Sequence, residues 1–205
     1  MNASPRQTIF LIRHTAPAVE RGICYGQSDV GLKESFLEEA ETIKPFLPEI
    51  SCQIFSSPLL RCRKLAQQLF PSDPVYLEPA LMEIHCGDWE LKNWDHIPKG
   101  EMDPWMKDFV RIRMPGGESY VDLFSRVTQF FNSITYSGRD AIIFTHGGVI
   151  RSILSYITQT SLTDSFSIFS LHYSCVVKLT GFGKAFRHEI LSNPPQSKEK
   201  HRPEA

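Results

Sequence analysis

Short apolar runs alternate along the chain with longer segments in which apolar residues recur at helical spacing. The runs, which predict strands buried on both faces, are residues 8–12, 53–55, 75–77, 141–144 and 176–179. The periodic segments, which predict helices, are residues 32–47, 59–70, 119–134 and 149–157. Strands that alternate with helices are typical of a mostly parallel sheet covered by helices on both faces. We therefore expect an α/β three-layer sandwich.

Two of the predicted helices begin with recognisable capping residues. Ser57 and Pro58 predict an N-cap and a first helical position for residues 59–70. This start places Arg61 in the first turn of that helix. Ser119 is the expected cap of the helix over residues 119–134.

Two histidines directly follow predicted strands. Arg13 and His14 come after the first strand, and His146 comes after the fourth. In open α/β sheets, ligands bind beyond the carboxyl ends of the parallel strands. We therefore expect His14, Arg61 and His146 to meet at this edge.

Residues 86–118 interrupt the alternation. They contain all three tryptophans, several prolines and little periodicity, so we expect an irregular lid beside the site. The indoles could stack on a flat ring, but local packing is the preferred interpretation. Residues 1–192 are expected to form one domain with this lid inserted, and the polar residues 193–205 a disordered tail.

The composition excludes several classes of protein. Lys+Arg 22 against Asp+Glu 23 gives no field that would hold a polyanion, so no nucleic-acid partner is expected. Neither a bilayer-length apolar run nor a signal-peptide pattern is present, which favours a cytoplasmic protein without a membrane partner. The five cysteines lack the paired spacing of zinc or redox sites, so no metal or cofactor is expected.

The residues at the strand ends suit phosphoryl chemistry. Guanidinium groups bind phosphate oxygens in bidentate fashion, so Arg13 and Arg61 form a candidate anion cradle. A histidine can act as a covalent nucleophile when its second ring nitrogen is held by a backbone carbonyl, and His14 is the candidate. Gly147 follows His146 at a helix start, where a small residue lets backbone N–H groups approach an anion.

Five motifs together resemble the histidine phosphatase superfamily, also called the phosphoglycerate-mutase-like fold. They are L-I-R-H-T at 11–15, S-S-P-L-L-R at 56–61, M-E-I-H-C-G-D-W-E at 82–90, P-G-G-E-S at 115–119 and T-H-G-G at 145–148. The resemblance implies that His14 is transiently phosphorylated while Arg13, Arg61 and His146 surround the phosphate. It also implies that Glu83 is the general acid that protonates the leaving oxygen.

The positive charge that this chemistry needs is expected from the protein itself. The two arginines and a protonated His146 would take the place of a magnesium ion. Glu90, in the same motif as Glu83, is a weaker candidate for the acid.

The loop after His14 departs from the usual pattern of the family. Thr15 stands where the family usually has glycine, and its hydroxyl could donate to a phosphate oxygen or satisfy the loop backbone. Residues 16–32 lack the asparagine common to mutases and resemble the C-Y-G-x-x-D element of bacterial alpha-ribazole phosphatases. In this resemblance Gln27 and Ser28 are candidate phosphate ligands; the alternative is an ordinary polar turn.

The resemblance therefore implies a metal-independent phosphomonoesterase. The expected partner is a small-molecule phosphate ester, namely alpha-ribazole 5′-phosphate or adenosylcobalamin 5′-phosphate in cobalamin assembly. A broad sugar-phosphate or nucleotide phosphatase, a phosphoglycerate mutase and a catalytically silent phosphate-binding module stay open as alternatives. The chain is expected to be a monomer or a homodimer.

Overall fold

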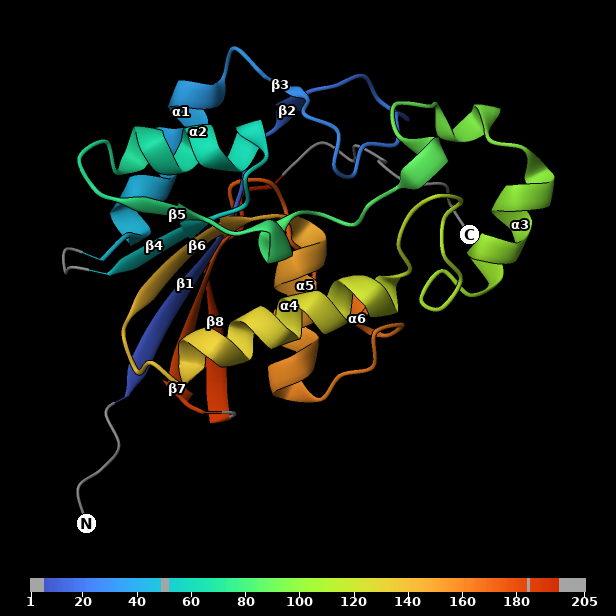
Figure 1. The fold of residues 1–205 in the computed structure, drawn as a ribbon. Helices are drawn as coiled ribbons and strands as arrows, with labels where there is room; N and C mark the ends of the chain where they lie inside the picture. Colours follow the sequence, from blue (N-terminus) through green and yellow to red (C-terminus); the bar gives the residue numbers. More distant parts are fainter. Residues whose placement is uncertain (1–5, 49–51, 184, 196–205) are drawn as a thin grey trace.

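A mixed sheet forms the centre of the computed structural model, which describes residues 6–48, 52–183 and 185–195 (Figure 1). Its strand order in the described residues is β5-β4-β6-β1-β7-β8. The strands are β1 Gln7–Arg13, β4 Gln53–Ser56, β5 Val75–Leu77, β6 Ala141–Thr145, β7 Val176–Phe182 and β8 Ala185–Ser192. A separate short ladder joins β2 Pro17–Ala18 to β3 Gly31–Leu32.

The central strands of the sheet are parallel. Strand β1 pairs with β6, β6 with β4, and β4 with β5, each in parallel register. Strands β7 and β8 extend the sheet on the other side of β1 as antiparallel neighbours. The predicted mostly parallel sheet is therefore confirmed, and the strand ends that carry His14 and His146 lie side by side.

Helices cover both faces of the sheet, as predicted (Figure 1). On one face, α4 Tyr120–Thr135 and α5 Gly147–Thr158 pack against alternate residues of β1, including Ile9 and Leu11. On the other, α1 Phe36–Ile43 and α2 Leu60–Leu69 pack against Phe10 and Ile12. Successive residues of β1 thus serve opposite cores, which explains why its whole run is apolar.

The predicted helix starts have different outcomes. The capping box of α4 is confirmed, because the Ser119 side chain accepts from the Asp122 backbone and Asp122 accepts from the Ser119 backbone. The cap at Ser57 is wrong, because α2 begins at Leu60, whose N–H donates to Asp29 Oδ1 at 2.6 Å. A distant loop therefore supplies that cap, and Arg61 still lies in the first turn.

The bounds of one helix were wrong, and one strand was missed. The helix expected over residues 32–47 begins later, because 31–32 belong to β3, and it ends in the 3₁₀ turn η1 Lys44–Phe46 after α1. Strand β8 was missed because it is an edge strand in which most residues are exposed and Phe186 is the one buried hydrophobic residue.

The segment 86–118 has more regular structure than expected. It contains η3 Gly87–Trp89, η4 Trp94–His96 and α3 Lys99–Lys107, the last with Pro104 inside it. Its three tryptophans pack against one another in a small core of their own, with ring centroids 5.5 to 6.1 Å apart. Local packing is therefore confirmed as the role of these indoles. That the segment acts as a lid stays a prediction.

The remaining predictions concern the ends and the surface. Most of the predicted disordered tail, residues 196–205, lies outside the described residues, as do residues 1–5 of the predicted domain.

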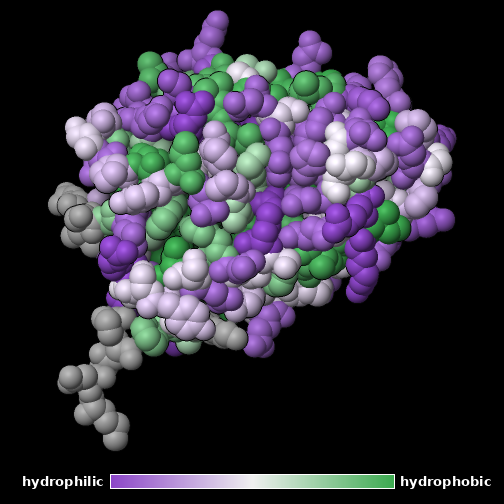
Figure 2. All heavy atoms as spheres, viewed as in Figure 1, coloured by the Kyte–Doolittle hydropathy of each residue, from purple (hydrophilic) through white to green (hydrophobic). Residues whose placement is uncertain are grey.

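The described residues include the short helix α6 Ser165–Ile168 and the turn η2 Pro79–Leu81. None of the helices in these residues has both the length and the apolar character needed to cross a membrane. Figure 2 shows a face on which hydrophilic side chains are interspersed with small groups of hydrophobic ones.

Candidate active site

Three predicted residues converge at the carboxyl ends of β1 and β6. His14 follows β1 and donates its backbone N–H to Thr145 O at 3.0 Å. His146 follows β6 and is the N-cap residue of α5. The two imidazole centroids lie 5.1 Å apart, and Arg61 Nε lies 3.3 Å from His14 Nε2. These side chains therefore meet at the strand ends, as predicted.

The imidazole of His14 has one defined hydrogen position. Its Nδ1 lies 2.7 Å from the backbone oxygen of Thr15. A carbonyl oxygen only accepts, so Nδ1 carries the hydrogen and Nε2 keeps its lone pair. His14 is 2% exposed. The side chain thus presents an unprotonated nitrogen in a site shielded from water.

Arg61 connects this nitrogen to the loop that follows β2. The side chain is completely buried, and Nε donates to His14 Nε2. Its two terminal nitrogens donate to Ser28 O at 3.0 Å and Gly26 O at 2.7 Å. The two backbone oxygens therefore fix the plane of the guanidinium against His14.

Arg13, the last residue of β1, directly precedes His14. It donates to Leu171 O, and its guanidinium carbon stands 4.1 Å from the ring centroid of Tyr173. Its Nε is buried and has no hydrogen-bond partner among the described residues. A Cβ at Gly147 would lie 3.4 Å from the same guanidinium. Arg13 therefore retains a donor for an anion.

His146 differs from its expected protonation state. Burial lowers its pKa well below the ordinary value, and the positive charges of Arg61 and Arg13 lower it further. The ring is fully buried, with Nε2 2.8 Å from Ser57 Oγ and 3.4 Å from Cys62 Sγ. The predicted protonated imidazole is therefore wrong for this state, in which His146 is neutral at about pH 7.

Glu83 lies at the N-terminus of α5. Its Oε2 accepts from Gly148 N at 3.0 Å, and its Oε1 accepts from Ile84 N at 3.0 Å. A Cβ at position 148 would lie 2.2 Å from Oε1, so only glycine leaves room for this carboxylate. Because His146 is the cap of the same helix, Glu83 lies beside the histidine pair.

Glu90, the weaker candidate for the general acid, is bound to the backbone of the loop at residues 26–28. Its carboxylate accepts from the backbone N–H groups of Gly26, Gln27, Ser28 and Cys86 and from the Ser28 hydroxyl. Burial raises its pKa, but these hydrogen bonds outweigh burial and the pKa is lowered. The carboxylate therefore holds the loop whose oxygens bind Arg61.

The three loop residues predicted to touch phosphate have different environments. Gln27 donates to Glu83 O at 3.0 Å, and the Ser28 hydroxyl donates to Glu90 Oε2 at 2.6 Å. Those hydrogens are used within the protein, so Ser28 has no donor left for phosphate here. Thr15 is fully buried, and its hydroxyl has no hydrogen-bond partner among the described residues. It does not satisfy the loop backbone, which was one of its two expected roles.

Two tyrosines at the site were missed. The hydroxyls of Tyr25 and Tyr173 are joined by a short hydrogen bond. The Tyr173 ring lies 5.4 Å from the His14 ring, and the Tyr25 ring centroid lies 5.4 Å from Arg61 Cζ. Burial raises the pKa of Tyr25, so its hydroxyl stays protonated. The pair therefore bridges the two arginines across His14.

No cluster of three or more His, Cys, Asp or Glu side chains within the described residues is arranged to hold a metal ion. The thiols of Cys24 and Cys86 belong to the apolar cluster around the tryptophans. They therefore pack as apolar residues beside the loop.

Comparisons with known proteins agree on the family. A model described as "Histidine phosphatase superfamily (branch 1)" matches residues 9–193. The metal-independent phosphoserine phosphatase of Arabidopsis thaliana is 30% identical over 165 residues, 75% of this chain and 69% of that protein. The adenosylcobalamin/alpha-ribazole phosphatase of Salmonella typhimurium is 23% identical over 156 residues, 72% of this chain and 77% of that protein. The solved alpha-ribazole phosphatase of Shigella flexneri superposes with a TM-score of 0.81 at 20% identity, covering 93% of this chain and 100% of that chain.

Proposed function

The chain belongs to the histidine phosphatase superfamily and is a phosphatase, and we propose that it hydrolyses phosphomonoesters through a phosphorylated His14. One observation carries this proposal. The hydrogen bond from His14 Nδ1 to the Thr15 carbonyl leaves Nε2 unprotonated and aimed at Arg61. An unprotonated nitrogen beside a phosphate-binding guanidinium is what a phosphoryl acceptor needs.

The first step transfers the phosphoryl group to the protein. His14 Nε2 attacks phosphorus in line, and the N–P bond forms as the P–O bond to the leaving group breaks. Glu83 gives its proton to the departing oxygen, so an alcohol leaves rather than an alkoxide. In this step Arg61 Nε exchanges its hydrogen-bond acceptor, from His14 Nε2 to a phosphate oxygen, and keeps its proton. Arg13 Nε donates to another phosphate oxygen.

The second step regenerates the free protein. Water attacks phosphorus, the N–P bond breaks, and the ionised Glu83 takes a proton from the water. Inorganic phosphate leaves, and Nε2 regains its lone pair. Glu83 thus acts as acid in one step and as base in the next.

The charges needed for this chemistry come from side chains. Arg13 and Arg61 stabilise the negative charge of the phosphoryl oxygens, and neutral His146 donates one hydrogen bond. A bound dianion favours the charged form of a nearby histidine, so binding raises the pKa of His146. We therefore expect activity to persist in EDTA.

Alpha-ribazole 5′-phosphate or adenosylcobalamin 5′-phosphate is the proposed substrate. The support is the C-Y-G-x-x-D element at Cys24 to Asp29 together with the similarity to the Salmonella typhimurium enzyme. The element builds the phosphate site, since Gly26 binds Arg61 and Asp29 caps α2. The choice of leaving group therefore rests on the relatives.

Phosphoserine is the second candidate substrate. A specific observation favours it, because the phosphoserine phosphatase of Arabidopsis thaliana shows 30% identity, more than the cobalamin-related enzyme. Both candidates are small phosphomonoesters and use the same proposed chemistry. They differ only in the leaving alcohol.

Phosphate release from a panel of esters tests the proposal. The panel contains alpha-ribazole 5′-phosphate, O-phosphoserine, 3-phosphoglycerate and p-nitrophenyl phosphate, each in EDTA, with His14→Ala as the control. A preference for the ribazole ester that is lost in His14→Ala supports the first substrate, and a preference for phosphoserine supports the second. Comparable rates on several esters support a broad phosphatase.

Two other results would redirect the assignment. Interconversion of phosphoglycerates that depends on a bisphosphoglycerate primer would identify a mutase. No release from any ester in the wild-type protein would leave a phosphate-binding module, and activity that survives in His14→Ala would refute the phosphohistidine.

A further inference from the structure

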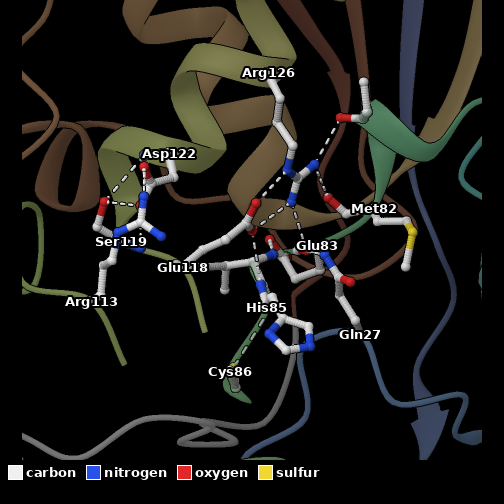
Figure 3. A network of polar contacts seen from close by, with 12 residues as sticks. Gln27, Met82, Glu83, His85, Cys86, Arg113, Glu118, Ser119, Asp122 and Arg126 are labelled. Carbon is white, nitrogen blue, oxygen red and sulfur yellow. Dashed lines mark hydrogen bonds and ion pairs between the residues drawn. The ribbon is translucent and has the colours of Figure 1, made fainter. Parts of the chain in front are cut away.

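Arg126, on the face of α4 that meets the site, binds the backbone of the segment that carries Glu83 (Figure 3). One terminal nitrogen donates to Ala80 O at 2.8 Å and Met82 O at 2.7 Å. The other donates to Glu83 O at 2.8 Å. One side chain therefore holds this short segment at three carbonyl oxygens.

Glu118 fixes the guanidinium from the other side (Figure 3). Its Oε1 accepts from Arg126 Nε at 2.8 Å and its Oε2 accepts from a terminal nitrogen at 2.9 Å. Oε2 also accepts from His85 N at 3.0 Å. Burial raises the pKa of Glu118, but the bonds from Arg126 and His85 outweigh burial and the pKa is lowered. Glu118 is therefore an ionised partner that orients Arg126.

The segment that carries Glu83 lacks the regular backbone hydrogen bonds of a strand or a helix. Residues 82–86 run between the turns η2 and η3 and belong to no strand or helix. The Met82 carbonyl accepts from Arg126 there, and the Glu83 carbonyl accepts from both Arg126 and Gln27. The Glu83 carboxylate meanwhile reaches Gly148 N on α5. Backbone anchoring on α4 and the carboxylate contact on α5 together fix where this carboxyl points.

We infer that Arg126, oriented by Glu118, is a positioning residue that sets the Glu83 carboxyl for proton transfer to the leaving group. The inference rests on the proposed role of Glu83 as the general acid. Arg126 binds carbonyls and Glu118 with all three guanidinium nitrogens, so it acts through Glu83. A shift of ~1 Å in a reacting group can cost about 10²-fold in rate. Loss of the Arg126 hydrogen bonds is therefore expected to slow the step in which Glu83 transfers its proton.

Two esters of similar shape separate positioning from a general loss of structure. p-Nitrophenyl phosphate releases a stable phenolate, which needs no proton in the transition state. p-Nitrobenzyl phosphate releases an alcohol, which does. kcat/KM reports the steps up to phosphorylation of His14, and the ratio of the two kcat/KM values does not depend on how much of a preparation is folded.

Arg126→Gln is expected to lower kcat/KM for the benzyl ester by about 10²-fold and for the phenyl ester by less than about threefold. Arg126→Lys should show the same selective loss, because an ammonium group cannot reproduce the planar fork. The matched control is Arg113→Gln. Arg113 is exposed and donates to Asp122 on α4 at 2.6 Å instead of to the segment that carries Glu83, so both esters should keep wild-type rates.

Glu83→Gln distinguishes a failure of the positioning role of Arg126 from a failure of the proposed acid role of Glu83. If Glu83→Gln loses the benzyl ester selectively and both Arg126 variants lose both esters equally, the positioning role is wrong and the acid stands. If Glu83→Gln shows no selectivity, the proposed acid itself fails. Selective loss in all three variants, with Arg113→Gln unchanged, supports the inference.

Discussion

The guanidinium of Arg61 donates from Nε to His14 Nε2 at 3.3 Å, and both side chains are buried. A phosphoryl group that reacts with Nε2 must take the position that this donor faces. The Nε–H then has a phosphate oxygen as its next partner. Because Gly26 O and Ser28 O hold the rest of the guanidinium, Arg61 can exchange partners without moving far.

This contact predicts that Arg61→Lys lowers kcat/KM for p-nitrophenyl phosphate by about 10²-fold or more. A lysine keeps the charge but cannot satisfy two carbonyl oxygens and a phosphate in one plane. Arg63→Lys, two residues along the same helix, is the matched control and should keep the wild-type rate. A decrease of less than about threefold in Arg61→Lys would show that charge alone suffices.

Gly148→Ala tests the space around the Glu83 carboxylate. The added Cβ would lie 2.2 Å from Glu83 Oε1 and 3.0 Å from Leu123 Cδ2, so the carboxylate must move. We expect kcat/KM for p-nitrobenzyl phosphate to fall by about 10²-fold, with a smaller loss on p-nitrophenyl phosphate. Gly100→Ala, where nothing lies within 4 Å, is the control. Wild-type rates on both esters in Gly148→Ala would contradict the placement of Glu83.

Glu90→Gln tests the loop that holds Arg61. The carboxylate accepts hydrogen bonds from Gly26, Gln27, Ser28 and Cys86, and an amide nitrogen cannot accept. Hydrogen bonds to charged groups are worth about 1.5–3 kcal/mol each, so we expect a loss of about 2–3 kcal/mol in the free energy of unfolding. Urea denaturation measures it.

The control for this variant is Glu38→Gln, an exposed carboxylate on α1. It should unfold at the wild-type urea concentration. Glu90→Gln should also lose activity, because its loop supplies the oxygens that bind Arg61. Unchanged stability in Glu90→Gln would mean that the loop is held by its other contacts.

The central residues of the candidate site could be predicted because their places follow from a local rule. His14 and His146 each end an apolar run, and the ends of neighbouring parallel strands meet wherever those strands pair. Tyr173 follows no such rule. It lies in the loop between α6 and β7, and it reaches His14 because β7 pairs with β1, a relation between distant segments.

The positioning residues escaped prediction for the same reason. Arg126 belongs to an amphipathic helix, where a charged residue is ordinarily a solvated one. Its role depends on α4 crossing the segment that carries Glu83, and the sequence pattern does not show that crossing. The cap of α2 is similar, since Ser57 has the right residue type but the side chain that accepts from the N–H of Leu60 is Asp29. Local patterns predict elements, and the contacts between elements decide which polar side chains they use.

The buried His146 predicts a pH dependence of stability. Its pKa in the folded protein is lowered well below the ordinary value of about 6.5 that applies when the chain is unfolded. Between these two pKa values the unfolded chain binds a proton that the folded protein does not. The free energy of unfolding therefore rises with pH in this window, by up to about 1.4 kcal/mol per pH unit. The stability that neutral His146 provides is complete above about pH 6.5 and decreases as the pH falls below it.

Urea midpoints measured from about pH 7 to about pH 5 test this dependence, because Glu90 and Glu118, with lowered pKa values, lose stability only in more acidic solution. His146→Asn should flatten the slope, whereas His96→Asn, at an exposed position, should leave it unchanged. An unaltered slope in His146→Asn would assign the proton to another group. Added vanadate should flatten the slope of the wild-type protein, because a bound oxyanion raises the pKa of His146 and lets the folded state take up the same proton.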